Sequence, residues 1–225
     1  MTEAIGTPGA TGSAAVRGVL FDMDGVLVFS EEAWFLVFGD TLRSFGVAPI
    51  GREEFFAIYG SGTKADRDRY MPRQTVEEVD AAYSRFFLER IDAVRPNDEA
   101  AGVLASLRAR GVRTAVATNT VSGLAREILG RTGLLPLLDA VASPDEAGAP
   151  KPDPAVLRLA ARRIGLGLDE CLFTGDSRYD RDAAAAAGVR FVGHRFGEGE
   201  RVESLAQILP MVGERVAAGA PGGQG

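Results

Sequence analysis

Apolar residues along the chain fall into two alternating patterns. Short apolar runs with little polar alternation are typical of strands that are buried on both faces. Such runs occupy residues 16–24, 112–120, 137–143, 170–177 and 189–194. Amphipathic stretches that are typical of helices lie between them, at 97–110, 121–131, 154–164 and 179–187. This alternation predicts an α/β fold in which helices cover both faces of a parallel sheet.

One long segment departs from this alternation. Residues 30–95 contain no strand pattern but carry helical patterns at 31–46, 52–60 and 75–92, separated by Gly or Pro. Because the segment follows the first strand, we expect 30–95 to be an α-helical cap domain inserted into a core domain of 16–29 and 96–213. The two ends, 1–15 and 214–225, are rich in small residues and predict flexible tails.

Polar residues that suit chemistry follow the predicted strands. In an open parallel sheet, ligands bind outside the carboxyl ends of the strands, so residues at those ends meet even when they are distant in sequence. The first, second and fourth strands end in polar residues, and a lysine follows the third. These residues are Asp22, Asp24, Thr118, Asn119, Lys151, Asp176 and Asp180.

This set of side chains predicts phosphoryl chemistry. Clustered carboxylates repel one another and attract a hard cation, and Mg²⁺ is commonly held by carboxylates together with phosphate oxygens. A carboxylate shielded by a cation can attack phosphorus and form an aspartyl-phosphate. Lys151 and the Thr118 hydroxyl could stabilise the charge on the transferred group. A second carboxylate could protonate the leaving oxygen and later deprotonate water.

Composition narrows the classes of partner. The chain has 225 residues, 46% of them hydrophobic and 25% charged, which is ordinary for a globular protein with a sizeable core. A net charge of −6 argues against nucleic acid as a partner. No apolar run approaches the roughly 20 residues of a membrane span, and no signal peptide is recognisable, so we expect a cytoplasmic protein. The single cysteine excludes an internal disulfide. Both a monomer and a homodimer remain open.

Four short motifs carry a resemblance to a known family. The segments "DMDGV", "ATN", "KPDP" and "GDSRYD" occur in this order and resemble the four motifs of the haloacid dehalogenase (HAD) superfamily. The resemblance covers residues 17–29 and 96–210 and implies a Rossmann-like core. The helical insert is similar to the α-helical cap of the phosphoglycolate phosphatase and β-phosphoglucomutase branch.

The resemblance implies a role for each motif residue. Asp22 would be the nucleophile and Asp24 the general acid and base. Thr118 would hold the phosphoryl group through its hydroxyl, and Asn119 through its backbone N–H. Lys151 would neutralise Asp22 and the phosphate. The implied cofactor is Mg²⁺, and its implied ligands are Asp22, the backbone carbonyl of Asp24, Asp176 and Asp180.

Three functions remain to be weighed within this resemblance. A magnesium-dependent phosphatase acting on a small phosphorylated metabolite is favoured. A sugar-phosphate mutase is the alternative, but the cap segment "GSGTKADRDRY" does not reproduce the mutase cap loop, which carries Arg, Ser and a hinge His–Lys pair. A catalytically silent binding protein is a remote alternative, because such proteins typically lose a motif aspartate. Asp24 also argues against dehalogenases and phosphonate-cleaving members, which lack this residue.

The cap offers four candidates for substrate binding. Lys64 and Arg67 could bind an anionic leaving group, although alternating Asp and Arg also suit a self-paired, solvated helix face. Glu31 and Trp34 follow the first strand and could face the pocket, with packing in the cap core as the other reading of Trp34. The identity of the substrate is open.

Overall fold

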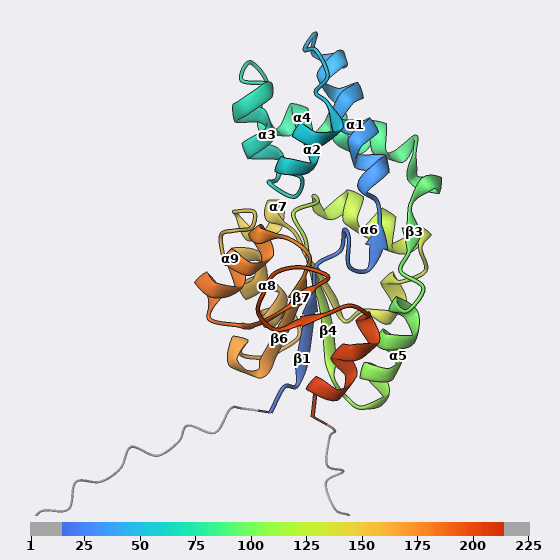
Figure 1. Cartoon of the computed structure of the whole chain (residues 1–225), viewed down its shortest axis with the longest axis vertical. Helices are drawn as coiled ribbons and strands as arrows, with labels where there is room; N and C mark the ends of the chain where they lie inside the picture. The colour runs from blue at the N-terminus through green and yellow to red at the C-terminus, as the bar shows by residue number, and fades with distance from the viewer. Residues whose placement is uncertain (1–14, 214–225) are drawn as a thin grey trace, which may run out of the picture.

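The core of the protein is a six-stranded sheet (Figure 1). The structure is a computed structural model that describes residues 15–213, so the predicted tails lie outside the described residues except for Ala15. The strands follow the order β5-β4-β1-β6-β7-β8, and every neighbouring pair is parallel. Their bounds are β1 (Gly18–Phe21), β4 (Arg113–Ala117), β5 (Ala140–Ala142), β6 (Cys171–Gly175), β7 (Arg190–His194) and β8 (Arg201–Val202). The predicted α/β fold with a parallel sheet is confirmed.

Helices cover both faces of this sheet, which explains why the strands lack polar alternation. Val19 and Phe21 of β1 belong to one apolar cluster, whereas Leu20 between them belongs to a second cluster on the opposite face. The first cluster includes buried residues of α5 (Ala100–Ala109) and α6 (Ser122–Arg131). The second includes those of α8 (Ala155–Arg163) and α9 (Arg178–Ala187). Both faces of the strands are therefore buried.

Short elements complete the core. A four-residue helix, α7 (Pro144–Ala147), precedes the segment that carries Lys151. The described part of the core also contains three 3₁₀ helices, η2 (Leu135–Leu137), η3 (Leu168–Glu170) and η4 (Leu205–Met211). The sequence pattern predicted neither the seven-residue η4 nor the two-residue β8, because elements this short show no clear hydrophobic period. η4 packs against α5 and extends the first apolar cluster.

The inserted segment forms a separate group of helices beyond the carboxyl ends of the strands (Figure 1). We call residues 30–95 the cap. Its elements are α1 (Glu31–Ser44), α2 (Arg52–Ile58), α3 (Thr63–Tyr70), α4 (Val76–Leu88) and η1 (Ile91–Ala93). The chain enters and leaves the cap through an antiparallel pair of two-residue strands, β2 (Val28–Phe29) and β3 (Arg95–Pro96), which the sequence pattern did not predict.

The interior of the cap is largely aromatic. The ring of Phe38 lies 5.4 Å from that of Phe55 and 5.5 Å from that of Tyr70, and Trp34 lies 4.6 Å from Phe87, between ring centroids. Aromatic pairs at these distances combine large buried area with favourable edge and offset contacts. None of the helices in residues 15–213 has the length and apolar character needed to cross a bilayer.

Candidate active site

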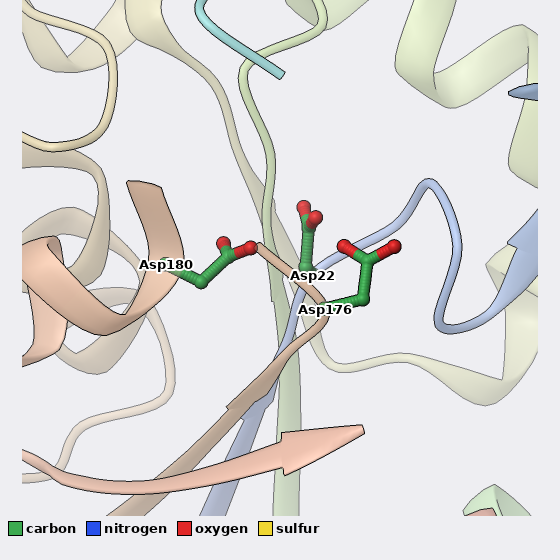
Figure 2. A group of neighbouring side chains, drawn as sticks. All are labelled: Asp22, Asp176 and Asp180. Atoms are coloured by element: carbon green, nitrogen blue, oxygen red, sulfur yellow. The ribbon is translucent and has the colours of Figure 1, made fainter. Parts of the chain in front are cut away.

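Three strand ends bring the predicted polar residues together. β1 lies between β4 and β6, so the residues that follow these strands are neighbours at one edge of the sheet. Asp22 follows β1, Thr118 follows β4 and Asp176 follows β6. Figure 2 shows the carboxyl groups of Asp22 and Asp176 beside that of Asp180, which comes from the first turn of α9. Residues that are far apart in the sequence thus share one site.

Lys151 is the buried centre of this site. Its side chain is 3% exposed, and its Nζ donates to Asp22 Oδ1 at 2.7 Å and to Asp180 Oδ1 at 2.6 Å. A third hydrogen bond, to the carbonyl oxygen of Ala117, measures 2.9 Å. Burial alone would lower the pKa of Lys151, but the charges of Asp180 and Asp22 outweigh it and raise the pKa above its ordinary value. The group therefore stays an ammonium ion.

Asn119 fixes the chain that carries this lysine. Its side-chain oxygen accepts a hydrogen bond from the backbone N–H of Lys151 at 2.7 Å, and its amide nitrogen donates to the carbonyl oxygen of Lys151 at 3.0 Å. The same nitrogen donates to the carbonyl oxygen of Gly60 in the cap, also at 3.0 Å. The side chain of Asn119 consequently joins the core to the cap loop.

A group of three carboxylates is suited to a cation. One oxygen from each of Asp22, Asp176 and Asp180 can be chosen so that all lie within 4.8 Å of one another. Burial, followed by the charges of neighbouring carboxylates, raises the pKa of Asp22 to about 7 and that of Asp176 to about 8. One ammonium does not balance three carboxylates. A hard divalent cation with oxygen ligands, such as Mg²⁺, fits this donor set.

The three carboxylates are not equivalent. Asp180 is fully buried, and one of its oxygens is bound by Lys151. The other oxygen accepts from the hydroxyl and the backbone N–H of Ser177, the second at 3.1 Å, in a capping box that begins α9. Asp180 is thus engaged on both oxygens by the protein, whereas Asp176 has no such protein donor among the described residues.

The loop after β1 approaches this group closely. Gly25 has a φ of +76°, and a Cβ atom at this position would lie 1.8 Å from Oδ2 of Asp176, so only glycine fits. The carbonyl oxygen of Gly25 lies 3.1 Å from Nδ1 of the buried His194 at the end of β7. The close approach to Asp176 therefore explains why a glycine stands in "DMDGV", which the sequence alone did not explain.

Asp24 is held by three donors. Ser30 Oγ and Trp34 Nε1 both donate to its Oδ1, the indole at 3.0 Å, and Thr120 Oγ1 donates to Oδ2 at 3.1 Å. Burial raises the pKa of Asp24, and these hydrogen bonds oppose the rise. Its side chain is not part of the three-carboxylate group. Sequence reasoning missed Ser30 and Thr120, since nothing in their spacing links them to Asp24.

A cleft between the sheet edge and the cap joins these groups. The core wall consists mainly of polar residues, and the cap wall is mainly aromatic. The core wall includes Asp22, Asp24, Thr118, Asn119, Thr120, Lys151 and Asp176. The cap wall includes Trp34, Phe38, Phe55, Ile58, Tyr59, Thr63, Asp66 and Tyr83. Thr118 is buried, and its oxygen accepts from the backbone N–H of Thr120 at 3.1 Å, which leaves the hydroxyl hydrogen free to donate into the cleft.

The predicted cap residues separate into two groups. Trp34 lines the cleft and contacts Asp24. Lys64, Arg67 and Glu31 are not among the residues that line it. Lys64 is exposed and pairs with Asp68 at 2.7 Å, and Arg67 pairs with the same carboxylate at 3.0 Å. Sequence reasoning missed four polar residues of the cap wall, Tyr59, Thr63, Asp66 and Tyr83, because their positions depend on how the cap helices pack.

Comparison with known proteins identifies the family. Residues 16–188 match the model of the haloacid dehalogenase-like hydrolases. A phosphoglycolate phosphatase from Pectobacterium atrosepticum is 31% identical over 88% of this chain and 93% of its own length. One from Cereibacter sphaeroides is 35% identical over 82% of this chain and 86% of its own. The chain therefore belongs to the haloacid dehalogenase-like hydrolase family, as the motifs predicted.

A solved structure extends the agreement to the fold. The crystal structure of a putative phosphoglycolate phosphatase from Lactobacillus plantarum superposes with a TM-score of 0.77 and covers 88% of this chain and 99% of its own, at 20% identity. At this identity the likeness concerns the fold. The family and the curated relatives confirm the prediction of a phosphoric monoester hydrolase.

Proposed function

We propose that this phosphatase hydrolyses a small phosphorylated metabolite through an aspartyl-phosphate on Asp22. The observation that carries the proposal is the buried ion pair between Asp22 and Lys151, at 2.7 Å, on the wall of a cleft that also exposes Asp24 and Thr118. An ammonium held in this way opposes the rise in the pKa of Asp22 that burial causes, and it reduces the repulsion between the carboxylate and an incoming phosphate.

The residues divide the two steps between them. In the first, an oxygen of Asp22 attacks phosphorus while the bond to the leaving oxygen breaks, and Asp24 gives that oxygen a proton. In the second, Asp24 takes a proton from water, and the water oxygen attacks phosphorus and releases Asp22. Lys151, whose three N–H groups donate to Asp22, Asp180 and Ala117, would balance the charge of the transferred group in both steps, and the hydroxyl of Thr118 would donate to one of its oxygens.

The implied metal belongs with the carboxylate group. Asp22, Asp176 and Asp180 would hold Mg²⁺, with Asp180 acting mainly through its hold on Lys151. When bound, the ion would supply positive charge between the carboxylates and the phosphoryl oxygens. The role of the backbone carbonyl of Asp24 as a further ligand stays a prediction.

We also propose that the cap acts as a mobile cover. The hydrogen bond from Asn119 to the Gly60 carbonyl and the bond from Trp34 to Asp24 both join cap to core and close the cleft. The chain passes between the core and residues 30–95 at β2 and β3, so these two short strands would form the hinge. Closure would exclude bulk water during the first step, and opening would release the product.

Phosphate release tests the proposed function. We expect Mg²⁺-dependent release from a panel of phosphate monoesters, its loss with chelator, and a fall of at least about 10³-fold in Asp22→Asn. Asp182→Asn is the matched control, since Asp182 is exposed in α9 and pairs with the adjacent Arg181. Activity of Asp22→Asn equal to that of the wild type would contradict the proposal. An isomeric phosphate ester formed without free phosphate would indicate a mutase.

A further inference from the structure

The cap wall of the cleft is poorly suited to an anion. Among the described residues that line the cleft, Lys151 is the one cation, and Asp22 and Asp180 already bind it. The cap side contributes Trp34, Phe55 and other aromatic or aliphatic side chains. Two basic residues of α3, Lys64 and Arg67, pair with Asp68 and do not line the cleft. A negative charge on the leaving group would meet no counter-charge there.

The one charged side chain on the cap wall is itself an acid. Asp66 belongs to α3, and its two oxygens accept from Ser61 Oγ at 2.7 Å and from Tyr83 Oη at 3.0 Å. Burial raises the pKa of Asp66 to about 6, while the two hydroxyl donors oppose the rise. The carboxylate is therefore the main form at neutral pH. Each of its oxygens keeps a lone pair for a further donor from a ligand.

A second polar group on the same wall lacks a partner. The hydroxyl of Tyr59 is buried near Ser30, whose side chain opposes the rise in its pKa, but it is not a partner in any hydrogen bond among the described residues. Burial, together with the nearby charge of Asp24, raises the pKa of Tyr59 well above its ordinary value, so the phenol is neutral. Buried polar groups normally find a partner. A neutral phenol beside the cleft offers both a donor and an acceptor to an oxygen or nitrogen of a bound molecule.

We propose that the alcohol released from the phosphate ester is uncharged, has a ring or another apolar face that packs on Trp34 and Phe55, and directs an O–H or N–H donor at Asp66. Alcohols that carry a carboxylate, glycolate among them, would be rejected because that group would meet Asp66 and no cation on a mainly aromatic cap wall. This inference rests on the proposed function. It also separates this chain from relatives that are named phosphoglycolate phosphatases.

Matched esters test this substrate class. The value of kcat/KM is measured with 4-(hydroxymethyl)benzyl phosphate, 4-carboxybenzyl phosphate and phosphoglycolate, all in the presence of Mg²⁺. The two benzyl esters share a leaving oxygen and a ring and differ in the distal group. We expect the hydroxymethyl ester to exceed the carboxy ester by at least about tenfold, and phosphoglycolate to be the poorest of the three.

Two variants assign the discrimination to Asp66. Asp66→Asn removes the negative charge and adds an amide donor, so the ratio between the two benzyl esters is expected to shrink by about tenfold. Glu53→Gln is the control, because Glu53 is an exposed acid of the cap that does not line the cleft, and its ratio should equal that of the wild type. If Asp66→Asn does not fold, the wild-type ratio still tests the proposal.

The contrary outcomes are distinct. Phosphate release with the carboxy ester or phosphoglycolate preferred would overturn the inference and leave the phosphatase standing. The inference would also be overturned if the ratio between the two benzyl esters did not change in folded Asp66→Asn. A preference for phosphoglycolate that Arg67→Met abolishes would overturn it as well. No release from any ester, under conditions that keep the protein folded with Mg²⁺, would instead overturn the proposed function and this inference with it.

Discussion

The two walls of the cleft are built on opposite principles. At the sheet edge, charged groups converge and satisfy one another, as when Lys151 binds Asp22 and Asp180 at 2.7 and 2.6 Å. On the cap side, aromatic rings form the surface, and the single charged group, Asp66, is held by neutral hydroxyls. This difference supports the proposed division, in which the core carries the reaction and the cap selects the alcohol that is released.

The two walls also differ in what holds their residues in place. Asp22, Thr118 and Asp176 follow buried strands whose register sets their relative positions, so their geometry follows from the backbone. Trp34, Tyr59 and Asp66 come from three different segments that meet only through side-chain packing. A substitution in the cap can therefore change specificity and leave the phosphoryl site intact.

The largest effect that separates the two regions is expected from Lys151→Met. The variant leaves Asp22 and Asp180 buried without their cation, and loss of one partner of a buried ion pair typically costs about 3–5 kcal/mol. The free energy of unfolding, measured by urea titration in chelator, should fall by about this amount. Saturating Mg²⁺ should recover part of the loss, because the ion replaces the missing positive charge.

The cap provides the matched control for this experiment. Arg90 pairs with Asp40 in the cap, and both side chains are about a quarter exposed. We expect Arg90→Met to cost about 1 kcal/mol or less and to be insensitive to Mg²⁺. Equal losses in the two variants, or no loss in Lys151→Met, would mean that the charges at the sheet edge are solvated and would remove the contrast between the two walls.

A smaller effect is expected from Trp34→Phe, which tests the contact between the two regions. Phenylalanine keeps an aromatic ring against Phe87 but removes the N–H that Asp24 accepts at 3.0 Å. A less firmly oriented Asp24 should transfer its proton less efficiently, so kcat/KM for alkyl phosphates, which reports the steps up to release of the alcohol, should fall about 3- to 10-fold. The value of kcat/KM for 4-nitrophenyl phosphate should change little, since its leaving group needs no proton and the second step does not enter this quantity.

The comparison of the two esters gives this prediction its control. Phe56→Leu, at an exposed aromatic residue of α2, should leave the ratio of kcat/KM values between the two esters unchanged. If Trp34→Phe slows the hydrolysis of both esters equally, Trp34 acts by packing alone. The cap would then have no part in orienting the general acid Asp24.

The positions of the core site residues were predictable from sequence because two simple rules determine them. Buried parallel strands require continuous apolar runs, and their carboxyl ends meet at one edge, so the apolar pattern was enough to place Asp22, Thr118 and Asp176 together. The strands β2 and β8 were not predicted, since two residues give no period. They exist because tertiary contacts position their backbones for pairing.

The cap wall was not predictable for a related reason. Helical periodicity located α1, α2 and α4, yet it does not determine how they pack, and so it could not select Asp66 over Lys64 or Arg67 as the residue at the cleft. The donors to Asp24 illustrate the same limit. Thr120 lies 96 positions from Asp24, and only the fold brings the two side chains within 3.1 Å.

The smallest expected effect concerns the ionisation of Asp66. The pKa of Asp66 is about 6 in the folded protein, against an ordinary value of 3.8, so the folded state binds its proton more tightly than the unfolded chain does. This group adds stability as the pH falls through 6 and loses that contribution as the pH rises. Between pH 7 and pH 5 the free energy of unfolding of the wild type should rise by about 1 kcal/mol relative to Asp66→Asn.

The difference in the free energy of unfolding between the two proteins isolates the titration of Asp66, because the titrations of Asp22 and Asp176 are common to both. Asp68→Asn serves as the control: its carboxyl is exposed, and its hydrogen bond with Lys64 lowers the pKa, so no such rise is expected. A difference between wild type and Asp66→Asn that stays flat from pH 7 to pH 5 would mean that solvent reaches Asp66 freely. The cap wall would then not be the enclosed apolar surface that the proposed selectivity against anionic alcohols requires.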